Sequence, residues 1–265
     1  MILKSLKKLL AIVVLVYVPM QSQAWGMLGH RIVGEIASLY LTPKAKKAIA
    51  EILGNESIAM ASNWGDFIKS DPSYNYLGSW HYINIDDSLS KSEFYARFEK
   101  DTTTDIFTKS KFCIDQLKNQ KLDLAKKKMY LRLLIHFIGD IHQPMHIGRS
   151  DDQGGNKLKV FWFGQATNLH RVWDEHLVEY QQLSYTEHAK AINFPTKAQK
   201  DQWQKQPMLD WIYESYQARL KIYAAIKQPE EKLSYKYNFD FVEMLNSQLL
   251  KGGIRLAAVL NELYK

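Results

Sequence analysis

The sequence predicts an all-α fold, mainly helical and formed by one domain, with a single small β-hairpin. Apolar residues recur at intervals of three to four over most of the chain, the period of helices that bury one face. No internal repeat and no low-complexity linker interrupts the 265 residues. The segment 25–265 has the length of one large domain with a substantial core.

The first 24 residues carry the pattern of a secretory signal peptide. Three lysines precede an unbroken apolar run over residues 9–18, and Ser22-Gln23-Ala24 supplies the small residues of a cleavage site. The apolar run is about half the ~20 residues of a membrane-spanning helix, which disfavours an uncleaved anchor. We therefore expect a signal peptide over 1–24 and a mature domain that begins at Trp25, without a stable membrane anchor.

Charge and cysteine content narrow the class of protein. The signal segment holds three lysines and no acids, so its removal lowers the formal net charge from +7 to +4. This mild surplus suits an acidic substrate such as nucleic acid. Cys113 is the only cysteine, so no intramolecular disulfide can form and the domain must be held by its core, by bound metal, or by both.

The lack of disulfides favours a secreted or periplasmic protein of bacterial origin. Asn55 opens a glycosylation sequon, which matters only in a eukaryotic secretory pathway. No feature of the sequence requires an obligate protein partner.

Helical periodicity predicts the elements in order. Thr42-Pro43 supplies a cap and a first-turn proline for the second helix, which ends at Gly54. Pro144 ends the central helix. Gly252-Gly253 is interpreted as a close-packing point within the last helix rather than a break. The predicted helices cover residues 30–40, 45–53, 126–141, 213–226 and 239–263.

Two segments differ from this pattern. Residues 158–163 are rich in β-branched and aromatic side chains and lie between Gly154-Gly155 and Gly164. They predict a short hairpin that projects from a helical body. Residues 83–110 are polar and ambiguous, and we expect a surface excursion with helical pieces.

Five of the eight histidines stand in patterns that suit metal binding. His136 and Asp140 are four residues apart on one predicted helix, so both side chains leave the same face. His170 and Asp174 repeat that spacing. His146 lies just beyond the break at Pro144, where the chain has turned and can direct a side chain to a neighbouring metal.

Three further candidates lie elsewhere in the chain. His30 follows closely after the expected N-terminus, Asp66 follows Trp64-Gly65, and His81 stands in a predicted loop or helix start. Imidazole and carboxylate without thiolate favour zinc in a catalytic role. One His-x-x-x-Asp pair is a weak signal, because the same spacing also occurs around buried hydrogen-bonded histidines and on solvated helix faces. Two such pairs with His146 beside one of them favour a metal site.

The remaining histidines receive other interpretations. His142 is four residues before His146, but Pro144 between them disrupts the helix that would align them. We interpret His142 as a structural or supporting residue. His176 and His188 have no suitable partners nearby, which favours solvated or core roles.

The assembled residues closely resemble the zinc-dependent single-strand nuclease and 3′-nucleotidase family, of the mung bean nuclease type. The block 136–146, HFIGDIHQPMH, is the most specific, and the resemblance covers essentially the whole mature chain. The other matching stretches are 25–30, 63–66, 80–84, 154–156, 168–174 and 253–257.

The resemblance implies a mainly α fold and three zinc ions per chain. Asp66, His81, His136 and Asp140 would hold one zinc. Trp25, through its free amine and its carbonyl oxygen, would hold the second together with His30 and the shared Asp140. His146, His170 and Asp174 would hold the third.

The resemblance also implies the reaction. The expected activity is endonucleolytic hydrolysis of single-stranded DNA and RNA to products with a 5′-phosphate, together with 3′-nucleotidase activity. Asp66 and Asp140 serve the chemistry as metal ligands. Because zinc stabilises charge on the departing oxygen, no side-chain general acid is required there.

Substrate contacts follow from the same resemblance. Tyr82 stands where the family stacks a base, although a packed aromatic would look alike in sequence, and Asn156 lies in a matching stretch. Asn84 replaces a carboxylate that the family often has, and it can both donate and accept. Lys69 replaces a frequent arginine near the reacting phosphate, so the charge is kept and the bidentate fork is lost.

Two alternatives remain. The related bacterial zinc phospholipase C group shares the N-terminal tryptophan and the three-zinc site. Its last ligand pair is typically His-x-x-x-Glu, whereas this chain has Asp174, and its first histidine lies further from the tryptophan. A zinc-storage module is the non-enzymatic alternative, but storage needs neither a shared carboxylate nor a stacking aromatic.

Overall fold

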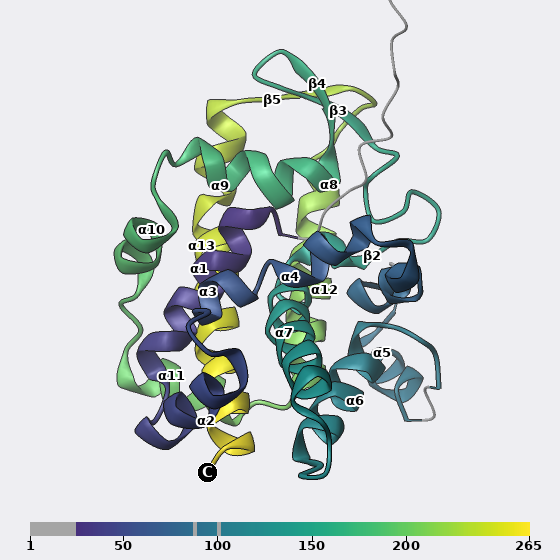
Figure 1. Cartoon of the computed structure of the whole chain (residues 1–265). Coiled ribbons are helices and arrows are strands. Elements are labelled where there is room, and N and C mark those ends of the chain that lie inside the picture. Colours follow the sequence, from purple (N-terminus) through teal and green to yellow (C-terminus); the bar gives the residue numbers. More distant parts are fainter. Residues whose placement is uncertain (1–24, 87–88, 100–101) are drawn as a thin grey trace, which may run out of the picture.

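A computed structural model describes residues 25–86, 89–99 and 102–265 of the chain. The predicted signal peptide, 1–24, lies outside the described residues. The described chain is mainly helical, which confirms the predicted fold class. The hairpin projects from one end of the helical body and the C-terminus lies at the other end (Figure 1).

The N-terminal third consists of short helices that follow one long one. Thr42 caps α2 by accepting a hydrogen bond from the Ala45 backbone N–H at 3.2 Å, and Pro43 occupies the first turn, as predicted. Gly54 ends α2 with a φ of 69°. The elements are α1 (Met27–Tyr40), α2 (Pro43–Leu53), α3 (Ile58–Ala61), α4 (Trp64–Phe67), the 3₁₀ helices η1 (Ile68–Ser70) and η2 (Pro72–His81), and β1 (Ile83–Asn84).

The middle of the chain carries the central helix. Helix α7 ends at Ile141, just before Pro144, as predicted. The ambiguous region 83–110 contains a complete helix, α5, and the start of another, α6, in its described parts. These elements are α5 (Lys91–Arg97), α6 (Ile106–Lys118), α7 (Leu124–Ile141), the 3₁₀ helix η3 (Pro144–His146) and β2 (Ile147–Gly148).

The C-terminal part contains the hairpin and the two longest late helices, both of which begin earlier than predicted. Its elements are β3 (Lys159–Trp162), β4 (Gln165–Asn168), α8 (Leu169–Arg171), the π-helix η4 (Val172–His176), α9 (Leu177–Tyr180), α10 (Tyr185–Ile192), α11 (Lys197–Lys205), α12 (Met208–Ala224), β5 (Glu231–Leu233) and α13 (Tyr235–Leu263).

A hairpin is present, but residues 158–163 supply only its first strand and the start of the turn, and the second strand follows Gly164. Strands β3 and β4 pair antiparallel, and both turn residues, Phe163 and Gly164, have positive φ angles of 48° and 83°. Such angles match the right-handed twist of a two-residue hairpin. Strand β5 adds to β3 in parallel, and β1 pairs with β2 in parallel; neither pairing was predicted.

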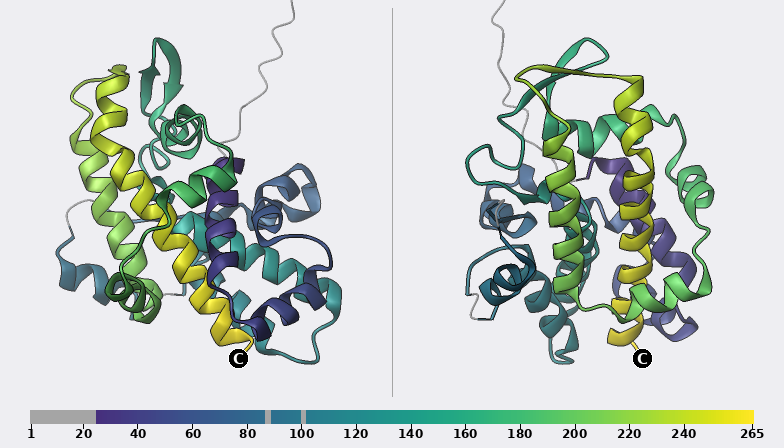
Figure 2. Two further views of the ribbon diagram at one scale, coloured as in Figure 1. Left: turned by 90° about the vertical axis from the view of Figure 1, so that its left-hand side faces the viewer. Right: turned by 180° about the vertical axis from the view of Figure 1, so that it is seen from behind.

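Helix α13 runs the length of the body and packs along α1 (Figure 2). A Cβ atom on Gly253 would lie 2.5 Å from the Cβ atom of Ile36, so only glycine permits this approach. The helix continues unbroken through Gly252-Gly253, as predicted. Within the described ranges, no helix combines the length and the apolar character that crossing a bilayer requires.

Candidate metal centre

The predicted metal ligands converge around the C-terminal half of α7. They come from the segment before α1 and from α1, α4, η2, α7, η3, α8 and η4, and every one of them is buried. They are Trp25, His30, Asp66, His81, His136, Asp140, His146, His170 and Asp174.

The local structure explains how these side chains are directed inward. His136 and Asp140 share one face of α7, as their spacing predicted. His81 was expected in a loop or at a helix start, but it is the last residue of η2. Asp174 lies in the π-helix η4, just after the turn that carries His170. Such π-turns are rare and occur frequently at functional sites.

The first cluster is organised by the carboxylate of Asp140. Its Oδ2 atom lies 3.1 Å from Nδ1 of His81 and 3.2 Å from Nε2 of His136. Its Oδ1 atom lies 3.2 Å from Nε2 of His30. The two oxygens thus face different imidazoles, which is the arrangement that a carboxylate shared between two cations requires.

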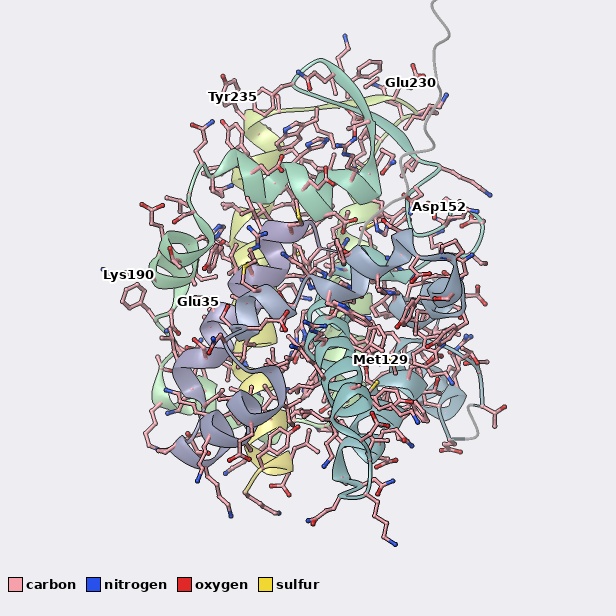
Figure 3. The ribbon with its side chains drawn as sticks, in the orientation of Figure 1. Glu35, Met129, Asp152, Lys190, Glu230 and Tyr235 are labelled. Carbon is pink, nitrogen blue, oxygen red and sulfur yellow. The ribbon has the colours of Figure 1, made fainter. Side chains whose placement is uncertain are left out.

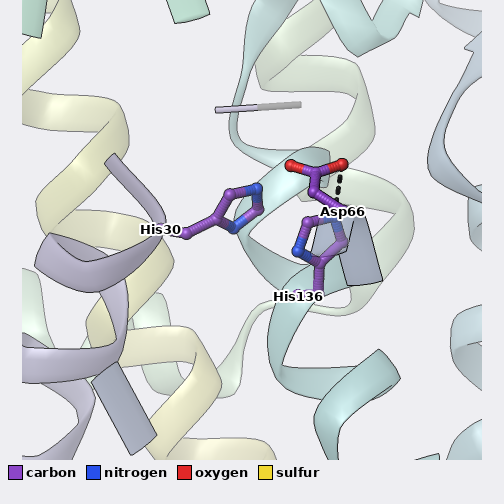
Figure 4. A group of neighbouring side chains, drawn as sticks. All are labelled: His30, Asp66 and His136. Atoms are coloured by element: carbon purple, nitrogen blue, oxygen red, sulfur yellow. Dashed lines mark ion pairs between the residues drawn. The ribbon is translucent and has the colours of Figure 1, made fainter. Parts of the chain in front are cut away.

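Asp66 completes this side of the centre. Its Oδ1 atom lies 3.7 Å from Nε2 of His136. His30 and His136 stack with ring centroids 3.9 Å apart. The side chains of the three residues are directed toward one another (Figure 4). His30, Asp66 and His136 form one group whose donor atoms lie within 4.8 Å of one another, and His81, His136 and Asp140 form another.

A second cluster lies beside the first. Nε2 of His170 is 3.0 Å from one oxygen of Asp174, and Nε2 of His146 is 3.8 Å from the other. The three donor atoms form a further group within the same 4.8 Å limit. Nδ1 of His146 lies 3.9 Å from Asp140 Oδ1, so the two clusters are neighbours.

Backbone carbonyls fix the orientation of three imidazoles. Nδ1 of His136 donates to the carbonyl of Ser62 at 2.6 Å, and Nδ1 of His146 donates to that of His81 at 2.7 Å. Nδ1 of His170 donates to the carbonyl of Gly154 at 2.8 Å. A carbonyl only accepts, so the hydrogen is on Nδ1 and the Nε2 lone pair faces the centre, as in metal-binding histidines.

Several buried polar atoms of the centre have no hydrogen-bond partner among the described residues. They include both ring nitrogens of His30, Nε2 of His81, His146 and His170, and Oδ1 of Asp140. An unsatisfied buried polar atom costs roughly 1–3 kcal/mol, so six of them together need an explanation. Cations bound among these atoms provide one. The nitrogen and oxygen donors, without thiolate, fit zinc.

The pKa shifts differ among the imidazoles of the centre. Burial, followed by the neighbouring imidazole of His136, lowers the pKa of His30 well below its usual value. Burial likewise lowers the pKa of His81 and of His146. Burial raises the pKa of Asp140 to about 7 although His136 opposes it. Neutral imidazole is the form that binds metal, so burial prepares these three histidines to act as ligands. Burial also opposes protonation of His136 and His170, but Asp140 and Asp174 raise their pKa values overall, so a cation must compete with a proton there.

Two glycines permit the close packing around the imidazoles. A Cβ atom on Gly65 would lie 2.7 Å from the ring of His136, and one on Gly139 would lie 2.7 Å from Nδ1 of His30. Any larger residue at either position would displace a candidate ligand.

Trp25 is held firmly at the centre. Its indole Nε1 donates to the carbonyl of Gly139 on α7 at 2.8 Å. The backbone N–H of the next residue, Gly26, donates to the carbonyl of Asp174 at 2.7 Å. The tryptophan is therefore fixed between the two segments that carry the candidate carboxylates Asp140 and Asp174.

A cavity of about 390 Å³ opens beside both clusters. His81, His146 and His170 form part of its wall. The predicted substrate residues Tyr82, Asn84 and Asn156 also line it, as does Lys69, which was predicted to act near the reacting phosphate. Tyr82 is 43% exposed, so it is not the packed core aromatic that the sequence left open.

Lys69 connects the cavity to the first cluster, because its Nζ atom lies 2.6 Å from Asp66 Oδ1. Sequence reasoning missed Ser150 and Gln153, which line the cavity, and Gln143, whose amide donates to Asp174. The only sign of these three residues in the sequence is that they lie within or close to the stretches that carry the predicted ligands.

The other histidines stay outside the clusters. Nδ1 of His142 donates to the carbonyl of Ile138 at 2.7 Å, and its Nε2 accepts from Arg255 at 3.0 Å. His142 is thus a structural residue, as interpreted. His188 is buried and hydrogen-bonds Asn246, and half-buried His176 contacts Thr167.

Comparison with known proteins agrees with this arrangement. The S1/P1 nuclease family model matches residues 25–265. Endonuclease 2 of Arabidopsis thaliana is 27% identical over 94% of this chain and 94% of its own. Endonuclease 3 of the same plant is 29% identical over 97% of this chain and 94% of its own. Nuclease S1 of Aspergillus oryzae is 28% identical over 68% of this chain and 67% of its own.

Proposed function

The chain belongs to the S1/P1 nuclease family, and on that premise we propose that it is a secreted zinc endonuclease that cleaves single-stranded DNA and RNA. The proposed products carry a 5′-phosphate, and 3′-nucleotides are further substrates. Family membership makes the protein a hydrolase of phosphodiesters. One observation supports the choice of substrate most: exposed Tyr82 lines the same cavity as the buried histidines of both clusters.

Three zinc ions are proposed as the cofactor. Asp66, His81, His136 and Asp140 would hold the first, and Trp25, His30 and Asp140 the second. His146, His170 and Asp174 would hold the third. Bound zinc lowers the pKa of water and stabilises negative charge that develops on oxygen. The two oxygens of the Asp140 carboxylate face different imidazoles, which supports its proposed role as the ligand shared by two zinc ions.

The protein's own residues bind and orient the strand. Tyr82 offers an aromatic face, and base–aromatic stacking contributes about 1–3 kcal/mol per base without regard to sequence. A duplex hides its base faces, so a stacking pocket selects single strands. The cationic Lys69 would contact a phosphate as a point charge. Asn84 and Asn156 supply amides that both donate and accept at base edges.

Maturation after Ala24 belongs to the same proposal. An α-amine is a metal ligand only when no residue precedes it and its proton has left. The double anchoring of Trp25 and Gly26 at the centre supports this role. Secretion would then expose the substrate-binding enzyme to nucleic acid outside the cell.

The decisive experiment uses the purified mature protein and four substrates: single-stranded DNA, RNA, a 3′-nucleotide and phosphatidylcholine micelles. We expect hydrolysis of the first three, 5′-phosphate ends by mass spectrometry, loss of activity on chelation and recovery with zinc. N-terminal sequencing and metal analysis should give Trp25 and three zinc ions. Release of choline phosphate without any nucleotide release would replace this proposal by a phospholipase C.

A further inference from the structure

One wall of the cavity is formed by the loop between β2 and β3. Ser150, Gln153, Gly154 and Asn156 of this loop line the cavity. Residues 153–155 have consecutive positive φ angles of 56°, 62° and 84°. A non-glycine residue in that conformation is strained, and such strain persists only where surrounding contacts enforce it. The loop therefore needs anchors.

Helix α12 provides these anchors from outside the cavity. The hydroxyl of Tyr223 donates to Oδ2 of Asp152 at 2.7 Å, and Oδ1 of the same carboxylate accepts the backbone N–H of Gly155 at 2.9 Å. Asp152 is labelled in Figure 3, on the loop that follows β2. A chain of two hydrogen bonds thus joins α12 to the left-handed turn.

Arg219, one helical turn before Tyr223, holds the start of the loop. Its Nη1 atom lies 2.7 Å from the carbonyl of Ile147 and 2.5 Å from that of Gly148. It also lies 2.8 Å from the carbonyl of Ile85, just after β1. One buried guanidinium therefore ties β1, which follows Tyr82, to β2, which follows His146.

We propose that Tyr223 and Arg219 are positioning residues for phosphodiester hydrolysis. Through Asp152 and the β2 carbonyls they hold the loop so that Gln153 and Asn156 face the substrate. The inference rests on the proposed use of the cavity as the substrate pocket. Neither residue lines the cavity, so both act through the loop.

The surroundings of Tyr223 favour a specific hydrogen bond over simple packing. The guanidinium of Arg149 lies over the Tyr223 ring at 5.1 Å from its centroid and pairs with Asp151 at 2.6 Å. Burial, with the Asp152 carboxylate, raises the pKa of Tyr223, so its hydroxyl remains a donor at all physiological pH values.

The first test compares Tyr223→Phe with Tyr213→Phe in the zinc-loaded mature protein. Both variants remove one hydroxyl from α12, but Tyr213 packs against Phe94 and Tyr95 away from the loop. For a single-stranded oligonucleotide we expect KM to rise about fivefold in Tyr223→Phe, as for one lost hydrogen bond. We expect kcat and zinc content to stay near wild type, and the control to match wild type. An unchanged KM in Tyr223→Phe would overturn the inference.

A second pair of variants tests the carboxylate itself. Asp152→Asn keeps an acceptor for Gly155 and gains a donor toward the Tyr223 oxygen, whereas Asp152→Ala loses both. We expect the asparagine variant to retain a KM near wild type and the alanine variant to raise it. Equal KM values for the two variants would contradict the positioning role.

Hydrogen exchange separates this inference from the proposed function. We expect the backbone amides of residues 153–156 to exchange faster in Tyr223→Phe than in wild type or Tyr213→Phe. Equal exchange would overturn the inference whatever the substrate is. Absence of single-strand hydrolysis by the wild-type protein would instead refute the proposed function. The exchange rates would then still decide whether Tyr223 holds the loop in place.

Discussion

His30 Nε2 lies 3.2 Å from Asp140 Oδ1, while the other oxygen of the same carboxylate faces a different pair of imidazoles. Both oxygens of one carboxylate thus face imidazoles, as the proposed shared ligand of two zinc ions would require. Asp140 is fully buried among these imidazoles, so removing its charge would leave the proposed zinc ions without the carboxylate that faces both of them.

We expect Asp140→Asn to lose metal from both of the proposed zinc sites that share it and to reduce activity by about a thousandfold, since the proposed catalysis depends on charge stabilisation by metal. Metal analysis of the purified variant and steady-state hydrolysis measure both effects. Asp240→Asn, which changes a surface carboxylate paired with Lys236, is the matched control. Full metal content in Asp140→Asn would show that the carboxylate is not shared.

A mature form with one extra residue before Trp25 should bind fewer zinc ions and lose most activity. The extra residue converts the proposed amine ligand into an amide, and Trp25 has no room to move because both it and Gly26 are anchored. The measurement is zinc per chain together with N-terminal sequencing. Three zinc ions and full activity in the extended form would exclude the amine as a ligand.

Tyr82→Ala should raise KM for single-stranded substrates about tenfold, since one base–aromatic stack is worth roughly 1–3 kcal/mol. Tyr76→Ala is the control, because Tyr76 is also an exposed tyrosine, at 53%, but does not line the cavity. Equal KM values for the two variants would place base stacking elsewhere.

His142→Ala should leave zinc content near wild type and lower the free energy of unfolding by about 2 kcal/mol, the cost of an unsatisfied buried donor. The donor left behind is Arg255, which also contacts Glu214 at 2.9 Å. Urea unfolding and metal analysis of the same samples provide the test. A loss of zinc with unchanged stability would make His142 a ligand rather than a structural residue.

His188 should contribute to a loss of stability in acid. Burial lowers its pKa below the unfolded value, although Asn246 opposes this. The unfolded chain then binds the proton more readily, so the contribution is complete above about pH 6.5 and declines as the pH falls further, by at most ~1.4 kcal/mol per pH unit. We expect His188→Gln to show a shallower decline of unfolding free energy between pH 6.5 and 5. A parallel decline would assign the acid sensitivity to other groups.

Helical periodicity predicted the positions of the long helices, because their buried faces repeat regularly. It placed the start of α13 at Phe239 rather than Tyr235, because Tyr235 and Lys236 are exposed and Tyr237 alone continues the buried face there. The β1–β2 pair was invisible to local patterns, since it joins two-residue strands from distant parts of the chain. Strand β5 was missed for the same reason.

Local sequence patterns also predicted only part of the candidate site. Spacing alone found His136 with Asp140 and His170 with Asp174, because four residues complete one helical turn. Trp25 entered only through the family resemblance. The carbonyls that orient the imidazoles could not be found, since backbone atoms carry no signature in a sequence. The anchoring of the cavity loop by α12 depends on contacts across the fold and was likewise beyond local reasoning.

The packing of α1 against α13 has a consequence for the timing of synthesis. The helix that carries His30 lies against the last helix of the described chain, through the close approach of Gly253 to Ile36. A ribosome makes α1 long before it makes α13. A nascent chain therefore lacks the support for its first imidazole until α13 has been synthesised and has left the ribosome. The centre that holds His30 cannot be fully packed before that point.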